Sequence, residues 1–210
     1  MGKIQAMTGN TATYTGAALC RPDLIAAYPI TPQSSVVEGL AGLVYNGKLD
    51  ARFVQVESEH SAMSVVQGAA SAGGRVFTAT SAQGLALMYE PYFRMSTLRI
   101  PMVMAIATRE MTSPETIWSG QQDAMSVRDA GWIQMFCESN QEILDMMIQA
   151  YASPRTSAFT FRSTSATTAF TVRTLWRDLR FRRRKQLTHF CRRITAAPIS
   201  IPVIRRRSIR

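Results

Sequence analysis

The chain has 210 residues, 46% of them hydrophobic, which predicts one well-buried domain and excludes global disorder. No apolar run is long enough to cross a membrane and the N-terminus lacks the apolar core of a signal peptide, so we expect a reduced, cytoplasmic protein. The formal net charge of +10 suggests a nucleic-acid or anionic-surface binder only if that charge belongs to one coherent fold.

The charge is divided sharply between two parts of the chain. Residues 1–151 hold 9 Lys+Arg and 13 Asp+Glu, a net of −4, whereas residues 152–210 hold 15 Lys+Arg and one acid, a net of +14. All 12 glycines and all 12 methionines lie in the first part. The break separates a segment of ordinary domain composition from an Arg/Ser/Thr-rich tail.

The first part alternates short apolar runs with segments of helical spacing. The pattern indicates, in chain order, apolar runs at Lys3–Met7 and Leu24–Tyr28, a helix at Ser34–Tyr45, a strand at Arg52–Val56, a helix at Ser61–Ala72, a strand at Arg75–Thr80, a helix at Leu85–Ser96, strands at Pro101–Thr108 and Trp132–Cys137, and a helix at Gln141–Tyr151. Repeated β-α units with continuous apolar strands predict an α/β fold, a parallel sheet covered by helices on both faces.

Ligands of such sheets bind beyond the carboxyl ends of the strands, which directs attention to the loops that follow them. The loop after Tyr28 presents the hydroxyls of Thr31, Ser34 and Ser35, either as helix caps or as part of an anion site at a helix N-terminus. The segment Glu57–His60 offers acid–base groups, or acids that favour the dipole of a capped helix.

Two further loops carry candidate site residues. After Thr80, Gly84 allows the backbone to approach a ligand closely, although the segment is neither a P-loop nor a GxGxxG motif. After Thr108, Arg109 can clamp a carboxylate, or it can form a surface ion pair.

Three strings in these loops, taken together, resemble the alpha subunit of the 2-oxoacid:ferredoxin oxidoreductases, the pyruvate:ferredoxin oxidoreductase family. They are AYPITPQSS (27–35), VQVESEHSAMSVVQGAASAGGRVFTATSAQGLALMYE (54–90) and ATRE (107–110). The resemblance covers about residues 1–151. It implies a truncated pyrimidine-type module of the thiamine diphosphate-binding fold, in an enzyme that oxidatively decarboxylates a 2-oxoacid, pyruvate by default, to acyl-CoA and passes electrons to ferredoxin.

The resemblance also implies roles for individual residues. Glu59 matches the catalytic glutamate that hydrogen-bonds the aminopyrimidine ring of the cofactor. Thr31 matches the hydroxyl that contacts substrate beside the cofactor, and Arg109 matches the arginine that binds the substrate carboxylate. Residues 81–84 are expected to shape the pocket wall, and His60 receives no role.

The rest of the machinery is expected in beta, gamma and delta subunits. The chain has no GDG-type motif for diphosphate and magnesium, and its three cysteines, Cys20, Cys137 and Cys191, are too far apart for an iron–sulfur cluster. Magnesium and the clusters are therefore assigned to partner subunits, with coenzyme A as cosubstrate and without a membrane or nucleic-acid partner. Two alternatives stay open: a non-catalytic pseudo-subunit that docks on a beta subunit, and a nucleic-acid binder that acts through the tail.

The resemblance stops after Tyr151. In a back-translation, one base restored after the Tyr151 codon permits an acidic, β-rich continuation that contains the DGF stretch of the family. We therefore expect residues 152–210 to be an out-of-frame translation, mostly disordered, and the sheet to lack its last strand. A genuine basic appendage and a sequencing error are the alternatives.

Overall fold

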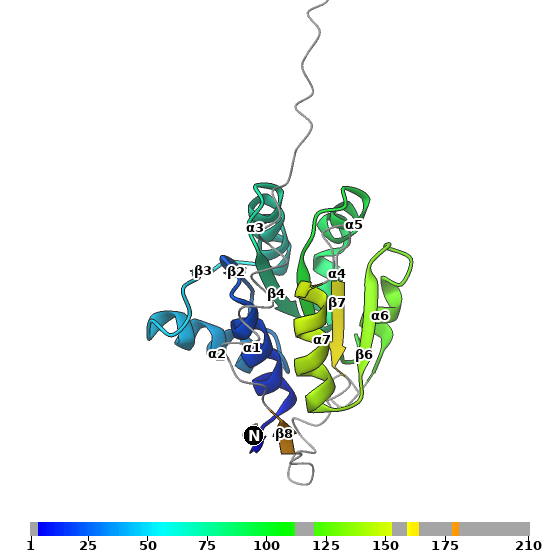
Figure 1. Cartoon of the computed structure of the whole chain (residues 1–210). Helices are drawn as coiled ribbons and strands as arrows, with labels where there is room; N and C mark the ends of the chain where they lie inside the picture. Colours follow the sequence, from blue (N-terminus) through cyan, green and yellow to red (C-terminus); the bar gives the residue numbers. More distant parts are fainter. Residues whose placement is uncertain (1–3, 112–119, 153–158, 164–177, 181–210) are drawn as a thin grey trace, which may run out of the picture.

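The structure is a computed structural model that describes residues 4–111, 120–152, 159–163 and 178–180. At its centre lies a six-stranded sheet (Figure 1). In spatial order the strands are β3 (Arg52–Val54), β2 (Leu24–Ala26), β4 (Val76–Thr80), β5 (Val103–Ala107), β7 (Phe159–Ser163) and β6 (Ile133–Cys137). All neighbouring strands are parallel, so their carboxyl ends share one edge, and the predicted α/β fold is confirmed.

Helices cover both faces of this sheet. One face carries α1 (Gly9–Cys20), α2 (Ser34–Tyr45) and α7 (Asn140–Ala152), and the other carries α3 (Glu59–Ser71), α4 (Ala82–Leu87), α5 (Tyr89–Thr97) and α6 (Gln122–Ser126). The central strands supply both cores by alternation: on β5, Ala105 packs with the first group and Met104 and Ile106 with the second. Among the described helices, none is long and apolar enough to cross a membrane.

Helix α1 is the longest of the elements that the sequence pattern does not predict. Small and hydroxyl-bearing residues dominate it, which leaves no marked apolar stripe. It packs along α7, and Figure 1 shows the two helices side by side. A Cβ added at Gly16 would lie 3.0 Å from the Cβ of Met147, so the missing side chain permits this close packing.

The other predicted elements are found with small shifts in their bounds. The helix predicted at Ser34–Tyr45 is confirmed to the residue. The helix predicted at Leu85–Ser96 is instead two helices, α4 and α5, that meet at Met88. Pro91 lies in the first turn of α5 and has no N–H to continue the hydrogen bonds of α4, which explains why a new helix begins there.

The expectation that the sheet lacks its last strand is wrong. Phe159–Ser163, inside the basic tail, forms β7 between β5 and β6, and Phe159 is in register with both Val103 and Ile133. The apolar run at Lys3–Met7 is also displaced from expectation, because β1 (Ile4–Ala6) pairs antiparallel with β8 (Asp178–Arg180) outside the main sheet. The remaining residues of the tail lie outside the described part of the chain.

The position of β7 predicts that the thermal stability of the protein depends strongly on the first residues of the tail, which contain this strand. A chain that stops after Ala152 leaves the inner edges of β5 and β6 unpaired. We expect it to aggregate or to unfold about 10 °C below the full chain in a thermal melt. The matched control stops after Arg180 and keeps β7 and β8. Equal melting temperatures for the full chain and the chain that stops after Ala152 would contradict the role given to β7.

Candidate functional site

Three loops at the carboxyl edge of the sheet meet at the side chain of Arg109. Its Nη1 donates to the carbonyl oxygen of Thr31 at 2.6 Å, and its Nη2 donates to Oε1 of Gln83 at 2.6 Å. These partners follow β2 and β4, whereas Arg109 follows β5. The fold therefore brings Thr31 and Arg109, which were predicted separately, into direct contact.

The guanidinium of Arg109 keeps unused donors. A guanidinium carries five N–H groups, and two of those in Arg109 are engaged by Thr31 and Gln83. The Nε is buried and has no hydrogen-bond partner among the residues that the structure describes. The surface ion pair considered for Arg109 is not formed with any described residue. A planar fork that has free N–H groups and forms no ion pair with a described acid is suited to a carboxylate.

Glu59 is the buried acid of the segment that follows β3. It stands in the first turn of α3, which Ser58 caps by accepting from the N–H of Ser61 at 3.2 Å. Glu59 is only 6% exposed, yet its carboxylate makes no hydrogen bond or ion pair with any residue that the structure describes. Because the residue is largely buried and none of the described residues donates to its carboxylate, this position suits a ligand that donates a hydrogen bond.

The neighbours of Glu59 differ from it in exposure and bonding. The Ser61 hydroxyl donates to Glu57, and this hydrogen bond lowers the pKa of that exposed carboxyl. His60 is exposed, and its Nε2 lies 3.9 Å from Oε2 of Glu90. Of the three candidates in the segment 57–60, only Glu59 is directed into the protein.

The turn after β4 links Glu59 to Arg109. A Cβ added at Gly84 would lie 2.6 Å from Oε1 of Glu59 and would overlap Oγ1 of Thr80. Gly84 was predicted to approach a ligand, and in the structure its backbone approaches Glu59 closely. Because Gln83 binds Arg109, two consecutive residues connect the buried acid with the guanidinium. The Oγ1 of Thr80 is buried in the same place and has no hydrogen-bond partner in the described part of the chain.

Asp123 organises these loops, although the sequence reasoning missed it. Its carboxylate is fully buried and accepts backbone N–H groups from Ala82 at 3.0 Å, Arg109 at 3.1 Å and Ala124 at 2.7 Å. A single carboxylate oxygen thus holds the turn after β4 against the strand end of β5. Asp123 lies in a short helix without a motif, so its partners become visible only in three dimensions.

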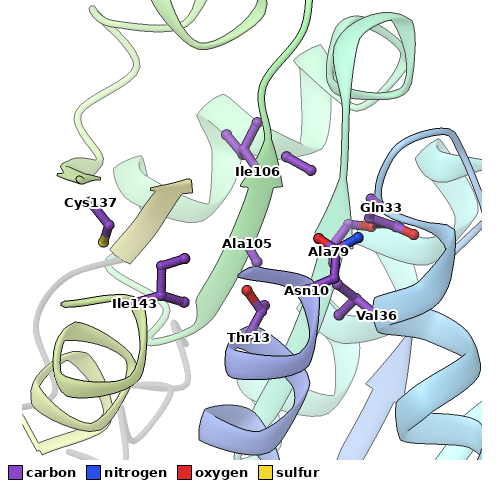
Figure 2. Close-up of a pocket in the computed structure, with 10 residues that line it drawn as sticks. Asn10, Thr13, Gln33, Val36, Ala79, Ala105, Ile106, Cys137 and Ile143 are labelled. Atoms are coloured by element: carbon purple, nitrogen blue, oxygen red, sulfur yellow. Dashed lines mark hydrogen bonds between the residues drawn. The ribbon is translucent and has the colours of Figure 1, made fainter. Parts of the chain in front are cut away.

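A small pocket lies at the same edge, on the opposite face of the sheet (Figure 2). It is bounded by α1, α2 and the ends of β4 and β5, and Gln33 lines it. Gln33 donates from Nε2 to the carbonyl oxygens of Ala79 at 2.5 Å and Tyr28 at 3.2 Å, while its Oε1 has no partner. These bonds fix the start of α2 against β4.

The loop that carries Thr31 is held from α1. Asn10 donates from Nδ2 to the carbonyl oxygen of Pro32 and to the hydroxyl of Ser35, both at 2.7 Å. Helix α2 begins at Ser34 with Gln33 as N-cap, and no side chain makes a capping bond there. The interpretation of this loop as a hydroxyl-capped helix start is therefore wrong, and Thr31 has an exposed side chain.

The described residues contain no group of three or more His, Cys, Asp or Glu side chains placed to hold a metal ion. Cys20 and Cys137 are buried and do not form a disulfide bond with each other. Burial raises the pKa of Cys137 to about 12, and the carboxylate of Glu142 adds to the rise. Cys191 lies outside the described residues.

Comparison with known proteins identifies the family. The family model described as "Pyruvate flavodoxin/ferredoxin oxidoreductase, thiamine diP-bdg" matches residues 15–163. Over 149 residues the chain is 53% identical to the NADH-dependent phenylglyoxylate dehydrogenase subunit alpha of Aromatoleum evansii, which covers 71% of this chain and 36% of that protein. Over 151 residues it is 53% identical to the pyruvate synthase subunit PorA of Methanocaldococcus jannaschii, which covers 72% and 39%.

A solved structure with the same fold supports this match. The 2-oxoglutarate:ferredoxin oxidoreductase from Magnetococcus marinus, with 2-oxoglutarate, coenzyme A and succinyl-CoA bound, superposes with a TM-score of 0.70 at 25% identity. The match covers 79% of this chain and 30% of that chain. The chain thus spans well under half the length of the relatives it matches. Because the family model covers most of the chain, the protein belongs to the pyruvate flavodoxin/ferredoxin oxidoreductase family.

Proposed function

We propose that this chain is the thiamine diphosphate-binding part of the alpha subunit of a 2-oxoacid:ferredoxin oxidoreductase. The reaction is the oxidative decarboxylation of a 2-oxoacid to an acyl-CoA, with pyruvate as the default substrate. One observation carries the proposal: the partnerless buried carboxylate of Glu59 and the open guanidinium of Arg109 are joined by two consecutive residues at the carboxyl edge of the sheet. The names of the relatives, which refer to pyruvate and phenylglyoxylate, support the 2-oxoacid class.

The residues at this edge fit the aminopyrimidine ring of thiamine diphosphate. Glu59 is buried without a donor, which suits an acceptor for the protonated ring nitrogen. The hydroxyl of Thr80 is an orphaned polar atom beside it. Gly84 brings bare backbone to the same point, where a side chain would overlap both neighbours. Glu59 would hold the ring, and the other two residues would shape its surroundings.

Each site residue then has a distinct task. Thiamine diphosphate, when bound, supplies the electron sink that decarboxylation of a 2-oxoacid needs. Glu59 holds a proton at the ring nitrogen. Arg109 binds the substrate carboxylate through the N–H groups that Thr31 and Gln83 leave free. The exposed hydroxyl of Thr31 contacts the substrate beside this carboxylate.

The remaining parts of the reaction are assigned to partners. The curated relatives extend well beyond the matched segment, since the match covers 36% and 39% of their lengths. We assign the diphosphate and magnesium to a beta subunit, and the iron–sulfur clusters to the beta, gamma and delta subunits, with ferredoxin as acceptor and coenzyme A as cosubstrate. The complex is placed in the cytoplasm.

We further propose that residues 152–210 are an out-of-frame translation that begins near Ala152. The fall of glycine and acid content at this point and the 145–151 residues over which curated relatives align support it. Sequencing the gene across codon 151 tests it. A long family-like frame that opens on restoring one base is the expected result, and a tail frame that stays intact with no such continuation in the shifted frame would overturn it.

The role of Glu59 predicts a large effect of Glu59→Gln. The amide keeps the shape of the side chain but cannot hold the proton, so turnover of pyruvate by the complex should fall about 100-fold or more. Thiamine diphosphate should also bind more weakly in isothermal titration calorimetry. Both are measured on the chain co-expressed with its partner subunits.

The exposed Glu38→Gln on α2 is the matched control and should leave turnover and cofactor binding unchanged. Equal cofactor affinity in Glu59→Gln and the wild-type chain would contradict the assignment. A wild-type complex that assembles without thiamine-dependent turnover would favour the pseudo-subunit instead.

The tight cluster around Gly84 predicts opposite outcomes for two glycine substitutions. Gly84→Ala forces a Cβ against Thr80 and Glu59, so we expect a loss of about 1–3 kcal/mol in the free energy of unfolding. Gly68→Ala places its Cβ on α3 with nothing within 4 Å, and should add about 0.5–1 kcal/mol. Urea titrations measure both values, and a neutral Gly84→Ala would refute the overlap.

A further inference from the structure

We propose that Gln83 is a substrate-positioning residue, which fixes the guanidinium of Arg109 in the orientation that receives a 2-oxoacid carboxylate. This inference rests on the proposed function and deepens it. Gln83 has no part in the roles assigned above to Glu59 and Thr31. The hydrogen bonds of its side chain go to Arg109 and Met111, and its contribution acts through Arg109.

Both ends of the Gln83 amide are engaged, which fixes its direction. The Oε1 accepts from Nη2 of Arg109 at 2.6 Å, and the Nε2 donates to the carbonyl oxygen of Met111. A rotated amide would set its NH₂ against the donors of the guanidinium and its oxygen against a carbonyl. The amide therefore has one favourable orientation, and this orientation presents an acceptor to Arg109.

The backbone on either side of Gln83 is also fixed. On one side, the N–H of Ala82 and the N–H of Arg109 share Oδ2 of the buried Asp123, at 3.0 and 3.1 Å. On the other side, Gly84 lies against Glu59. The side chain of Gln83 therefore starts from a rigid turn, so it can hold Arg109 at a set place relative to Glu59.

A neutral partner preserves the charge of the guanidinium. Glutamine accepts the Nη2 hydrogen bond without forming an ion pair, and no described acid pairs with Arg109. The full positive charge remains for the substrate carboxylate. A glutamate at this position would keep the hydrogen bond but would compete with the substrate for the charge. The amide of Gln83 can therefore orient the guanidinium of Arg109 without neutralising its charge.

Without Gln83, the bond to the carbonyl oxygen of Thr31 would be the one hydrogen bond left between the guanidinium and the described residues. A side chain held by one hydrogen bond can rotate about its terminal bonds and lose the orientation that a bidentate carboxylate needs. The loss should appear in the binding of substrate more than in the chemical step, because Glu59 is untouched.

The test uses the chain co-expressed with its partner subunits and compares Gln83→Ala, Gln83→Glu and Gln122→Ala. Gln122 is the matched control, because its Oε1 accepts from the N–H of the same Met111 without contacting Arg109. Steady-state kinetics with pyruvate, 2-ketoisovalerate and phenylglyoxylate give KM and kcat. Butanedione labelling of Arg109, followed by peptide mass mapping, reports the freedom of the guanidinium without any turnover.

Gln83→Ala should raise KM about tenfold, leave kcat within about threefold, and speed butanedione labelling of Arg109 several-fold. Gln83→Glu should raise KM to a similar extent but keep the slow labelling of the wild-type chain, since the acceptor remains. Gln122→Ala should change neither value.

The experiment distinguishes a failure of the positioning role of Gln83 from a failure of the proposed function. A Gln83→Ala variant with wild-type KM and labelling, or one that loses kcat at constant KM, overturns the positioning role while the proposed function stands. A correctly assembled wild-type complex that turns over none of the three acids overturns the proposed function and this inference with it.

Discussion

The parallel pairing of β4 with β5 is the constraint on which the site depends. Thr80 is in register with Ile106, so the two strands end together and their loops start side by side. The hydroxyl of Ser81 donates to the carbonyl oxygen of Ala107 at 2.6 Å and closes the junction one step beyond the ladder. Asp123 then accepts from the N–H of Ala82, one residue after Ser81, and from the N–H of Arg109, two residues after Ala107. The hydrogen bond between Gln83 and Arg109 follows from this order, because both side chains start from the ends of adjacent strands that are in register.

Two carboxylates of buried residues near this junction differ in the hydrogen bonds that the fold gives them. Asp123 accepts three backbone N–H groups, which compensate its burial and make it part of the scaffold. Glu59 is buried almost as deeply and accepts from no described residue. Asp123 therefore has its hydrogen bonds within the protein, whereas the carboxylate of Glu59 remains able to accept a hydrogen bond from a ligand. The difference arises from the backbone: the loops converge on Asp123, whereas Glu59 meets the backbone of Gly84 without receiving a hydrogen bond from it.

Sequence patterns predicted the central strands and most of the helices, but not the elements and contacts that depend on small residues or on main-chain groups. Continuous apolar runs located β4 and β5, and the helix at Ser34–Tyr45 followed from its apolar spacing. Glu59 and Arg109 stood out because they follow strands of a parallel sheet. Helix α1 escaped detection because its contact with α7 uses small residues such as Gly16, which give no apolar period. The role of Asp123 was not predicted because its three partners are main-chain N–H groups. Every residue type except proline carries such a group, so the sequence does not indicate these hydrogen bonds.

The tail shows that a segment can pair its backbone in the sheet although its composition differs from that of the rest of the chain. A strand between β5 and β6 needs only free N–H and C=O groups on an extended segment, and residues such as Phe and Thr favour that conformation. Phe159–Ser163 meets this need inside a segment whose composition differs from the rest of the chain. Backbone pairing therefore completes the sheet without deciding whether the segment is in its proper frame. The net charge of +10 has the same origin: it is the sum of a site-bearing part at −4 and a basic tail at +14. In the proposed site, the charge that matters for a carboxylate substrate is that of Arg109, whose guanidinium forms no ion pair with any described acid.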